Sequence, residues 1–143
     1  MIRTLIVDDE LLARENLKLL LSDFCENVEV IGEADSVDAA IESITKLKPA
    51  LVFLDIRMPS GAEGFELLER IDSKDFVVIF VTAFKDYAIK AFNANAIHYI
   101  LKPIDIEDLQ NALKKVAEYF KMKRSLPLKD FNYAQLLENL TLS

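Results

Sequence analysis

The sequence is poor in the residues on which several kinds of site depend. Its 143 residues include one cysteine, Cys25, and one histidine, His98, so neither an internal disulfide framework nor a thiolate metal cage is available. Three glycines and four prolines leave little room for long irregular loops. Basic residues number 17 against 24 acidic ones, and the resulting net charge of −7 argues against nucleic acid or an anionic membrane as a direct partner.

Long hydrophobic runs are also missing. No apolar stretch approaches the roughly 18 residues of a membrane span, and the start, Met1-Ile2-Arg3, leads into a strand pattern, which does not resemble a signal peptide. We therefore expect a cytoplasmic chain with no membrane association. The length predicts one domain, and an apolar content of 52% is enough for a packed core.

Apolar runs alternate with amphipathic stretches along the chain. Five runs are predicted to be strands, at residues 5–7, 28–31, 51–54, 76–81 and 97–101. Helical spacing of apolar residues predicts helices at about residues 11–24, 36–47, 65–71, 85–92 and 105–121. Strict alternation predicts an α/β protein with a doubly wound, five-stranded parallel sheet covered on both faces. Ligands of such sheets bind beyond the carboxyl ends of the strands.

Five side chains that carry chemistry stand at those strand ends. They are Asp8, Asp9, Asp55, Thr82 and Lys102. Each has an ordinary explanation by itself: Asp9 or Thr82 could cap a helix, Asp55 could belong to a turn, and Lys102 could be a surface charge. Random placement would not put all five at one edge, however, so together they predict a functional site.

The chemistry of these five groups favours a cation and a phosphoryl group. Three crowded carboxylates repel one another unless a positive charge compensates them. An oxygen-only site without cysteine or histidine suits Mg²⁺. We expect Asp55, on the central strand, to be the nucleophile, while Asp8 and Asp9 hold the metal and Lys102 and Thr82 bind phosphoryl oxygens.

Four motifs then occur in the order and near the spacings of a known family. They are Val-Asp-Asp-Glu at 7–10, Leu-Asp-Ile-Arg-Met-Pro at 54–59, Val-Thr-Ala at 81–83 and Tyr-Ile-Leu-Lys-Pro at 99–103. With these motifs the chain resembles the receiver domain of two-component response regulators over about residues 1–122. The resemblance implies a flavodoxin-like (CheY-like) fold with strand order 2-1-3-4-5, and leaves residues 123–143 as a linker or tail with one short helix.

The resemblance also implies roles at the site. Asp55 becomes the phosphoacceptor, and Asp8, Asp9 and Asp55 become ligands of Mg²⁺ together with the backbone carbonyl of Arg57. The phosphoryl donor would be a sensor histidine kinase. The product would be a phosphorylation-driven switch, and the only reactions of the chain would be its own phosphorylation and dephosphorylation.

Switching involves further residues in this family. Thr82 resembles the hydroxyl that turns toward the phosphoryl group, and Tyr99 the aromatic residue that changes rotamer with it. Lys102 matches the family's lysine, and its bond to Pro103 is expected to be cis. The surface of the fourth helix, fifth strand and last helix would then change, which would alter homodimerisation or contact with an output domain.

Two segments bear on the subfamily and the loop. Residues 91–96 and 136–140 are similar to receivers attached to LytTR-type (LytR/AlgR) DNA-binding domains, which implies transcription regulation. Such an output domain has no counterpart within these residues, so any DNA contact would be made through a domain outside them. The loop at residues 60–64 departs from the family pattern, because it is one residue longer than usual.

Three other functions use related folds or chemistry. An aspartate-nucleophile phosphatase would need a second carboxylate two residues after Asp55, where Arg57 stands. A flavodoxin would need a Ser/Thr/Gly-rich phosphate loop after the first strand, where residues 8–10 are acidic. A receiver that acts only as a docking module, without phosphorylation, stays open. The single histidine, His98, is expected to be a surface residue.

Overall fold

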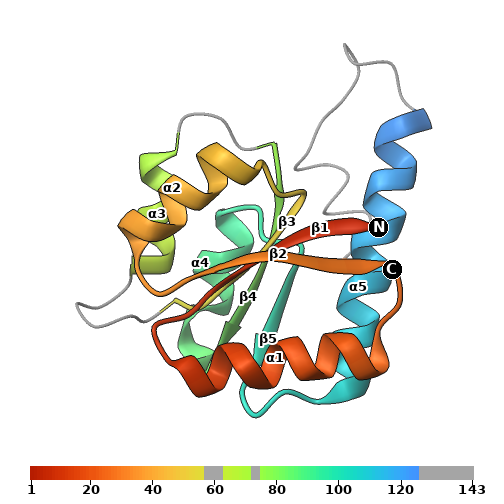
Figure 1. Ribbon diagram of the computed structural model, residues 1–143, viewed down its shortest axis with the longest axis horizontal. Coiled ribbons are helices and arrows are strands. Elements are labelled where there is room, and N and C mark those ends of the chain that lie inside the picture. The colour runs from red at the N-terminus through yellow and green to blue at the C-terminus, as the bar shows by residue number, and fades with distance from the viewer. Residues whose placement is uncertain (57–62, 72–74, 126–143) are drawn as a thin grey trace.

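The computed structural model describes residues 1–56, 63–71 and 75–125. The strands are β1 (Ile2–Val7), β2 (Val28–Ala34), β3 (Leu51–Leu54), β4 (Val77–Thr82) and β5 (His98–Leu101). The helices are α1 (Leu11–Phe24), α2 (Val37–Leu47), α3 (Glu63–Arg70), the 3-10 turn η1 (Lys85–Tyr87), α4 (Ala88–Asn93) and α5 (Ile106–Ser125). The strands pair in parallel in the order β2-β1-β3-β4-β5, which confirms the predicted α/β fold (Figure 1).

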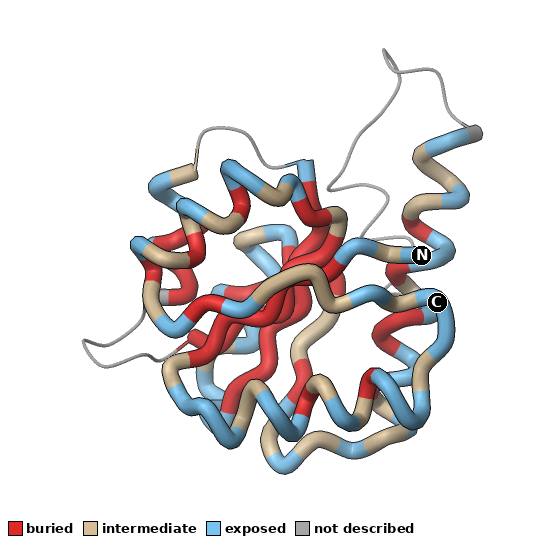
Figure 2. Tube along the Cα trace, viewed as in Figure 1, coloured by how far each residue is buried: buried red, intermediate tan, exposed pale blue. Residues whose placement is uncertain are grey.

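The helices cover the sheet in two layers. Helices α1 and α5 lie on one face, and α2, α3 and α4 lie on the other (Figure 1). Because successive side chains of a strand point to opposite faces, β3 divides evenly: Val52 and Leu54 pack under α2–α4, while Leu51 and Phe53 pack under α1 and α5. Buried residues follow the central strands (Figure 2). All four residues of β3 are buried and apolar, because helices cover both faces of the sheet at this strand.

Several boundaries differ from the predicted ones. β2 continues three residues beyond the predicted end at Ile31, and the fourth helical segment divides into η1 and the short α4. α5 extends to Ser125, past both its predicted end and the expected domain boundary at residue 122. The rest of the predicted tail lies outside the described residues, as do residues 60–62 of the unusual loop.

Helix ends are specified unevenly by local sequence. At α2 the Ser36 hydroxyl accepts a hydrogen bond from the Ala39 amide at 3.1 Å, and Lys48 ends the helix in a left-handed conformation. At α1 the residue in the capping position is Glu10, and its side chain makes no capping hydrogen bond. The alternative that Asp9 merely caps α1 is therefore wrong. No helix among the described residues is long and apolar enough to cross a membrane.

Candidate functional site

The backbone pairing of the sheet positions the site. Parallel hydrogen bonding continues one residue past three strands: the Asp8 amide donates to the Ala34 carbonyl at 3.0 Å, the Asp55 amide to Val7 at 3.0 Å and the Lys102 amide to Thr82 at 2.8 Å. Each of these site residues is thus tied to the end of a neighbouring strand. Their side chains converge because the carboxyl ends of adjacent parallel strands share one edge.

Three carboxylates come together at this edge. Asp8, Asp9 and Asp55 each offer an oxygen atom within 4.8 Å of the others. Asp8 and Asp55 are only 6% exposed, whereas Asp9 is more open to solvent. Burial, followed by the charge of Asp8, raises the pKa of Asp9. An oxygen-only cluster that disfavours its own negative charge fits a hard divalent cation, so the residues present suit Mg²⁺.

Lys102 places a positive charge in direct contact with two of these carboxylates. Its Nζ lies 2.7 Å from Oδ2 of Asp8 and 3.3 Å from Oδ2 of Asp55. Burial works against the ammonium charge, but the hydrogen bond and charge of Asp8 and the charge of Asp55 outweigh it and raise the pKa of Lys102. The side chain is therefore a permanent cation at neutral pH.

Asp55 has the properties expected of a reactive carboxylate. Burial is the largest influence on its pKa and raises it, while the charge of Lys102 opposes this and Asp8 reinforces it. Hydrogen bonds from Lys102 and from the Thr82 hydroxyl lower the pKa further back toward its ordinary value. The result is a largely inaccessible carboxylate at the end of the central strand, in contact with the Lys102 ammonium and with oxygens of Asp8 and Asp9 within 4.8 Å.

One peptide segment connects Thr82 with Tyr99. Thr82 is fully buried, and its Oγ1 accepts a hydrogen bond from the Phe84 amide at 3.3 Å. The Phe84 carbonyl in turn accepts a hydrogen bond from the hydroxyl of Tyr99. The Tyr99 ring lies 6.4 Å from the ring of Phe80, centroid to centroid. Phe84 therefore links the two side chains through its backbone, although they belong to different strands.

Comparison with known proteins shows which family the chain belongs to. A family model described as "Response regulator receiver domain" matches residues 4–114. The chain belongs to this family. The receiver matches an uncharacterized response regulatory protein of Shewanella oneidensis with 48% identity over 117 residues, covering 81% of this chain and 49% of the relative. It also matches the sensory transduction protein LytT of Bacillus anthracis with 45% identity, covering 87% of this chain and 50% of that relative.

Solved structures agree with the fold of this receiver. The response regulatory domain of mrkE from Klebsiella pneumoniae superposes with a TM-score of 0.74 at 30% identity, covering 84% of this chain and 98% of that structure. The chain spans about half the length of the curated relatives it matches. The predicted flavodoxin-like fold and the receiver family are thus confirmed, and LytT agrees with the predicted LytTR resemblance in its name.

The structure brings together five of the predicted site residues of this receiver. Asp8, Asp9, Asp55, Thr82 and Lys102 meet at one edge, with Tyr99 beside them. The Lys102–Pro103 peptide bond is cis, as predicted. Arg57 lies outside the described residues, so the proposed role of its carbonyl stays a prediction.

Gly64 was not recognised from the sequence as part of the receiver site. Its amide donates to the Ile56 carbonyl at 3.0 Å, so α3 begins directly against the segment that follows β3. A Cβ atom at this position would lie 2.5 Å from the carbonyl oxygen of Asp55 and 2.9 Å from Cα of Ile56. Only glycine lets the two backbones approach this closely.

The surroundings of His98 differ from those expected. It is not a plain surface residue: its Nε2 lies 2.8 Å from Oδ1 of Asp108, and its Nδ1 lies 3.1 Å from Nζ of Lys115. Both partners belong to α5, so the imidazole ties β5 to that helix. The sequence placed His98 on a strand but could not show which residues of α5 face it.

Proposed function

We propose that Asp55 accepts a phosphoryl group from the phosphohistidine of a sensor histidine kinase, so that the chain acts as a phosphorylation-driven switch. One observation carries this proposal: the buried Asp55 carboxylate ends the central strand with Lys102 Nζ at 3.3 Å and with oxygens of Asp8 and Asp9 within 4.8 Å. A carboxylate oxygen of Asp55 would attack phosphorus while the phosphorus–nitrogen bond breaks and its electron pair returns to the donor imidazole.

The acidic cluster is proposed to hold Mg²⁺. The ligands would be carboxylate oxygens of Asp8, Asp9 and Asp55, with the backbone carbonyl of Arg57. When bound, the ion would neutralise negative charge on the phosphoryl oxygens. Lys102 would contribute to the same neutralisation from its own position between Asp8 and Asp55, and its raised pKa keeps it charged for this task.

The switch would use the link through Phe84. A phosphoryl group on Asp55 carries nearly two negative charges and places them beside the Thr82 hydroxyl. If that hydroxyl turns to donate to the phosphoryl oxygens, the Phe84 amide loses its acceptor on Thr82. The same residue's carbonyl holds Tyr99, so the segment and the Tyr99 ring are proposed to move together.

Turnover of external substrates does not fit the site as well. A phosphatase with an aspartate nucleophile would need a carboxylate two residues after Asp55, and the sequence has Arg57 there. We therefore propose phosphoacceptance and self-dephosphorylation as the only reactions. A docking module without phosphorylation would not need a buried carboxylate cluster in which Lys102 contacts both Asp8 and Asp55.

The output is proposed to lie in another domain. Because the chain spans half of its curated relatives, and one of these is named LytT, we propose transcription regulation through a LytTR-type DNA-binding domain. The α4-β5-α5 surface would mediate homodimerisation or contact with that domain, since Phe92 and Leu101 are 56% and 43% exposed there. A cytoplasmic location, where the kinase domain would meet it, belongs to the same proposal.

Intact mass spectrometry tests the phosphoacceptor. The chain is incubated with a small acyl phosphate, with and without Mg²⁺, beside Asp55→Asn and the matched control Asp23→Asn, which changes an exposed aspartate of α1. We expect one Mg²⁺-dependent phosphoryl group on the wild type and the control, and none on Asp55→Asn.

The absence of any adduct would leave two readings, a docking module or a very short-lived acyl phosphate. Beryllofluoride separates them, because it occupies a phosphoryl site without needing a lasting covalent bond. Binding of beryllofluoride to the wild type but not to Asp55→Asn would keep the proposal. No binding by either protein would overturn it.

A further inference from the structure

The start of α1 departs from what a helix by itself prefers. The first turn contains Arg14 and no acidic residue, and the capping residue, Glu10, makes no side-chain capping bond. A cation near a helix N-terminus faces the positive end of the helix dipole, which is unfavourable. Departures of this kind from local preference tend to occur where function requires them.

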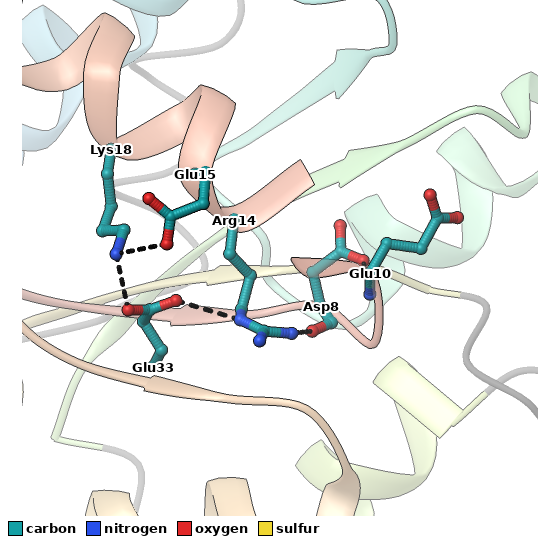
Figure 3. Close-up of polar contacts among 6 residues, drawn as sticks. All are labelled: Asp8, Glu10, Arg14, Glu15, Lys18 and Glu33. Atoms are coloured by element: carbon teal, nitrogen blue, oxygen red, sulfur yellow. Dashed lines mark hydrogen bonds and ion pairs between the residues drawn. The ribbon is translucent and has the colours of Figure 1, made fainter. Parts of the chain in front are cut away.

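The Arg14 side chain reaches from α1 to the residue that follows β1 and to β2. One terminal guanidinium nitrogen donates to the backbone carbonyl of Asp8 at 2.7 Å, and Nε donates to Oε1 of Glu33 on β2 at 3.0 Å (Figure 3). Lys18 holds the other oxygen of Glu33 at 2.7 Å and also contacts Glu15. The Arg14 side chain is only 14% exposed, so this is not an ordinary solvated surface pair.

These contacts complete the immobilisation of Asp8. Its amide donates to Ala34, its Oδ1 accepts from the Glu10 amide at 3.0 Å and its Oδ2 accepts from Lys102 at 2.7 Å. The carbonyl is the remaining polar group, and its donor is Arg14. Because the peptide group is planar, the orientation of that carbonyl also fixes the peptide that leads to Asp9.

We propose that Arg14 is a positioning residue for the divalent-cation site, which it serves by locking the Asp8–Asp9 peptide, while Glu33 and Lys18 hold the guanidinium in place. This inference rests on the proposed function, since it concerns the cation that the same acidic cluster would bind. Arg14 contacts the carbonyl of Asp8 and acts through the backbone, not through contact with the cation.

Electrostatics and positioning predict opposite effects for this residue. Removing a positive charge beside an acidic cluster should, by Coulomb's law alone, strengthen the binding of a divalent cation. Loss of a positioning hydrogen bond should weaken it, because partners that orient metal ligands typically contribute about 10–100-fold to metal affinity. The sign of the change in affinity for Arg14→Gln therefore distinguishes the two.

The test uses Mn²⁺ as the probe, titrated into the chain and followed by the loss of the free-ion electron paramagnetic resonance signal, with displacement by Mg²⁺. We expect Arg14→Gln to bind Mn²⁺ about tenfold more weakly than the wild type. Arg14→Lys keeps the charge but lacks the planar fork that reaches both Asp8 and Glu33. We therefore expect its Mn²⁺ affinity to lie between those of Arg14→Gln and the wild type.

Arg3→Gln is the matched control. Arg3 also donates from a guanidinium to a backbone carbonyl, that of Lys48 at 3.0 Å, but near the opposite end of β1. A merely structural role of such bonds would lower thermal stability in both variants without separating their Mn²⁺ affinities. We expect the Arg3→Gln affinity to equal that of the wild type.

Arg14→Lys keeps the inference testable if Arg14→Gln does not fold, because it leaves the charge unchanged and alters only the guanidinium fork, so Mn²⁺ binding equal to that of the wild type would overturn the inference. Where Arg14→Gln folds, Glu33→Gln adds a second test. The lost negative charge by itself would weaken Mn²⁺ binding equally in the wild type and in Arg14→Gln, whereas positioning through Arg14 predicts that the double variant binds like Arg14→Gln alone. Unchanged or tighter binding by Arg14→Gln would overturn the inference. A wild-type chain that binds neither Mn²⁺ nor Mg²⁺ would instead overturn the cation site of the proposed function.

Discussion

Replacing Asp55 with asparagine should stabilise the folded chain when no divalent cation is present. At an effective dielectric constant of about 20, attraction by Lys102 across 3.3 Å is about 5 kcal/mol, and repulsion by Asp8 across at most 4.8 Å is about 3.5 kcal/mol or more. The net Coulomb effect of Lys102 and Asp8 thus favours the charge of Asp55 by at most about 1.5 kcal/mol. Burying a carboxylate costs several kcal/mol.

Burial must outweigh the favourable Coulomb effect, because the pKa of Asp55 is raised and burial is the largest cause. Asparagine has the same shape and keeps one oxygen for Lys102 but carries no charge. We therefore expect Asp55→Asn to raise the free energy of unfolding by about 2 kcal/mol at neutral pH, as the difference between burial and Coulomb contributions.

The stability that Asp55→Asn gains over the wild type should increase with pH. A carboxyl group whose pKa is higher in the folded than in the unfolded chain destabilises the folded state once it ionises. The advantage of Asp55→Asn should be complete above the raised folded pKa and should narrow as the pH falls toward the ordinary value of 3.8. Below that value neither protein carries a charge at residue 55.

Urea unfolding followed by circular dichroism measures these effects, in chelator and at increasing Mg²⁺. A cation at one hundred times its dissociation constant stabilises the folded state by about 2.7 kcal/mol. The wild type should gain more from Mg²⁺ than Asp55→Asn, which has lost an anionic ligand, and the exposed control Asp23→Asn should follow the wild type. Lower stability of Asp55→Asn in chelator, or equal Mg²⁺ gains in both proteins, would refute the reasoning.

Three further substitutions test other parts of the structure. Gly64→Ala should destabilise the chain by about 2 kcal/mol, because its Cβ would meet the Asp55 carbonyl at 2.5 Å; unchanged urea unfolding would contradict that close approach. Ser36→Ala should cost about 1 kcal/mol through loss of the α2 cap, and an unchanged melting temperature would count against the cap. Phe84→Ala should speed loss of the phosphoryl group by admitting water beside Thr82, whereas an unaltered dephosphorylation rate would rule this out.

Much of the fold was determined by sequence pattern alone. β3 and β4 are apolar along nearly their whole length because both faces are covered, and this pattern needs no tertiary information to be read. Ser36 and Pro49 bracket α2 with local signals. The same alternation placed Asp8, Asp55 and Lys102 at strand ends, and the rule for parallel sheets then placed them at one edge.

The predicted helix ends agree with the structure where the local sequence signals are strong and differ from it where these signals are weak. The segment at 85–92 divides into η1 and α4. α5 continues past its predicted end at residue 121, where Met122 still packs against the core cluster on the sheet face that this helix covers. Packing between elements decides such ends, and no short-range pattern encodes it.

Only the tertiary structure decided which hydrogen bonds connect the site residues to one another and to their neighbours. Arg14, Glu33 and Asp8 are up to 25 residues apart, and the sequence gives no sign that α1 would turn an arginine back onto the Asp8 carbonyl, apart from the unusual cation in the first helical turn. Likewise the Phe84 backbone joins Thr82 to Tyr99 across two strands. Period and composition determine which face an element buries, but hydrogen bonds between distant residues depend on where the folded elements finally lie.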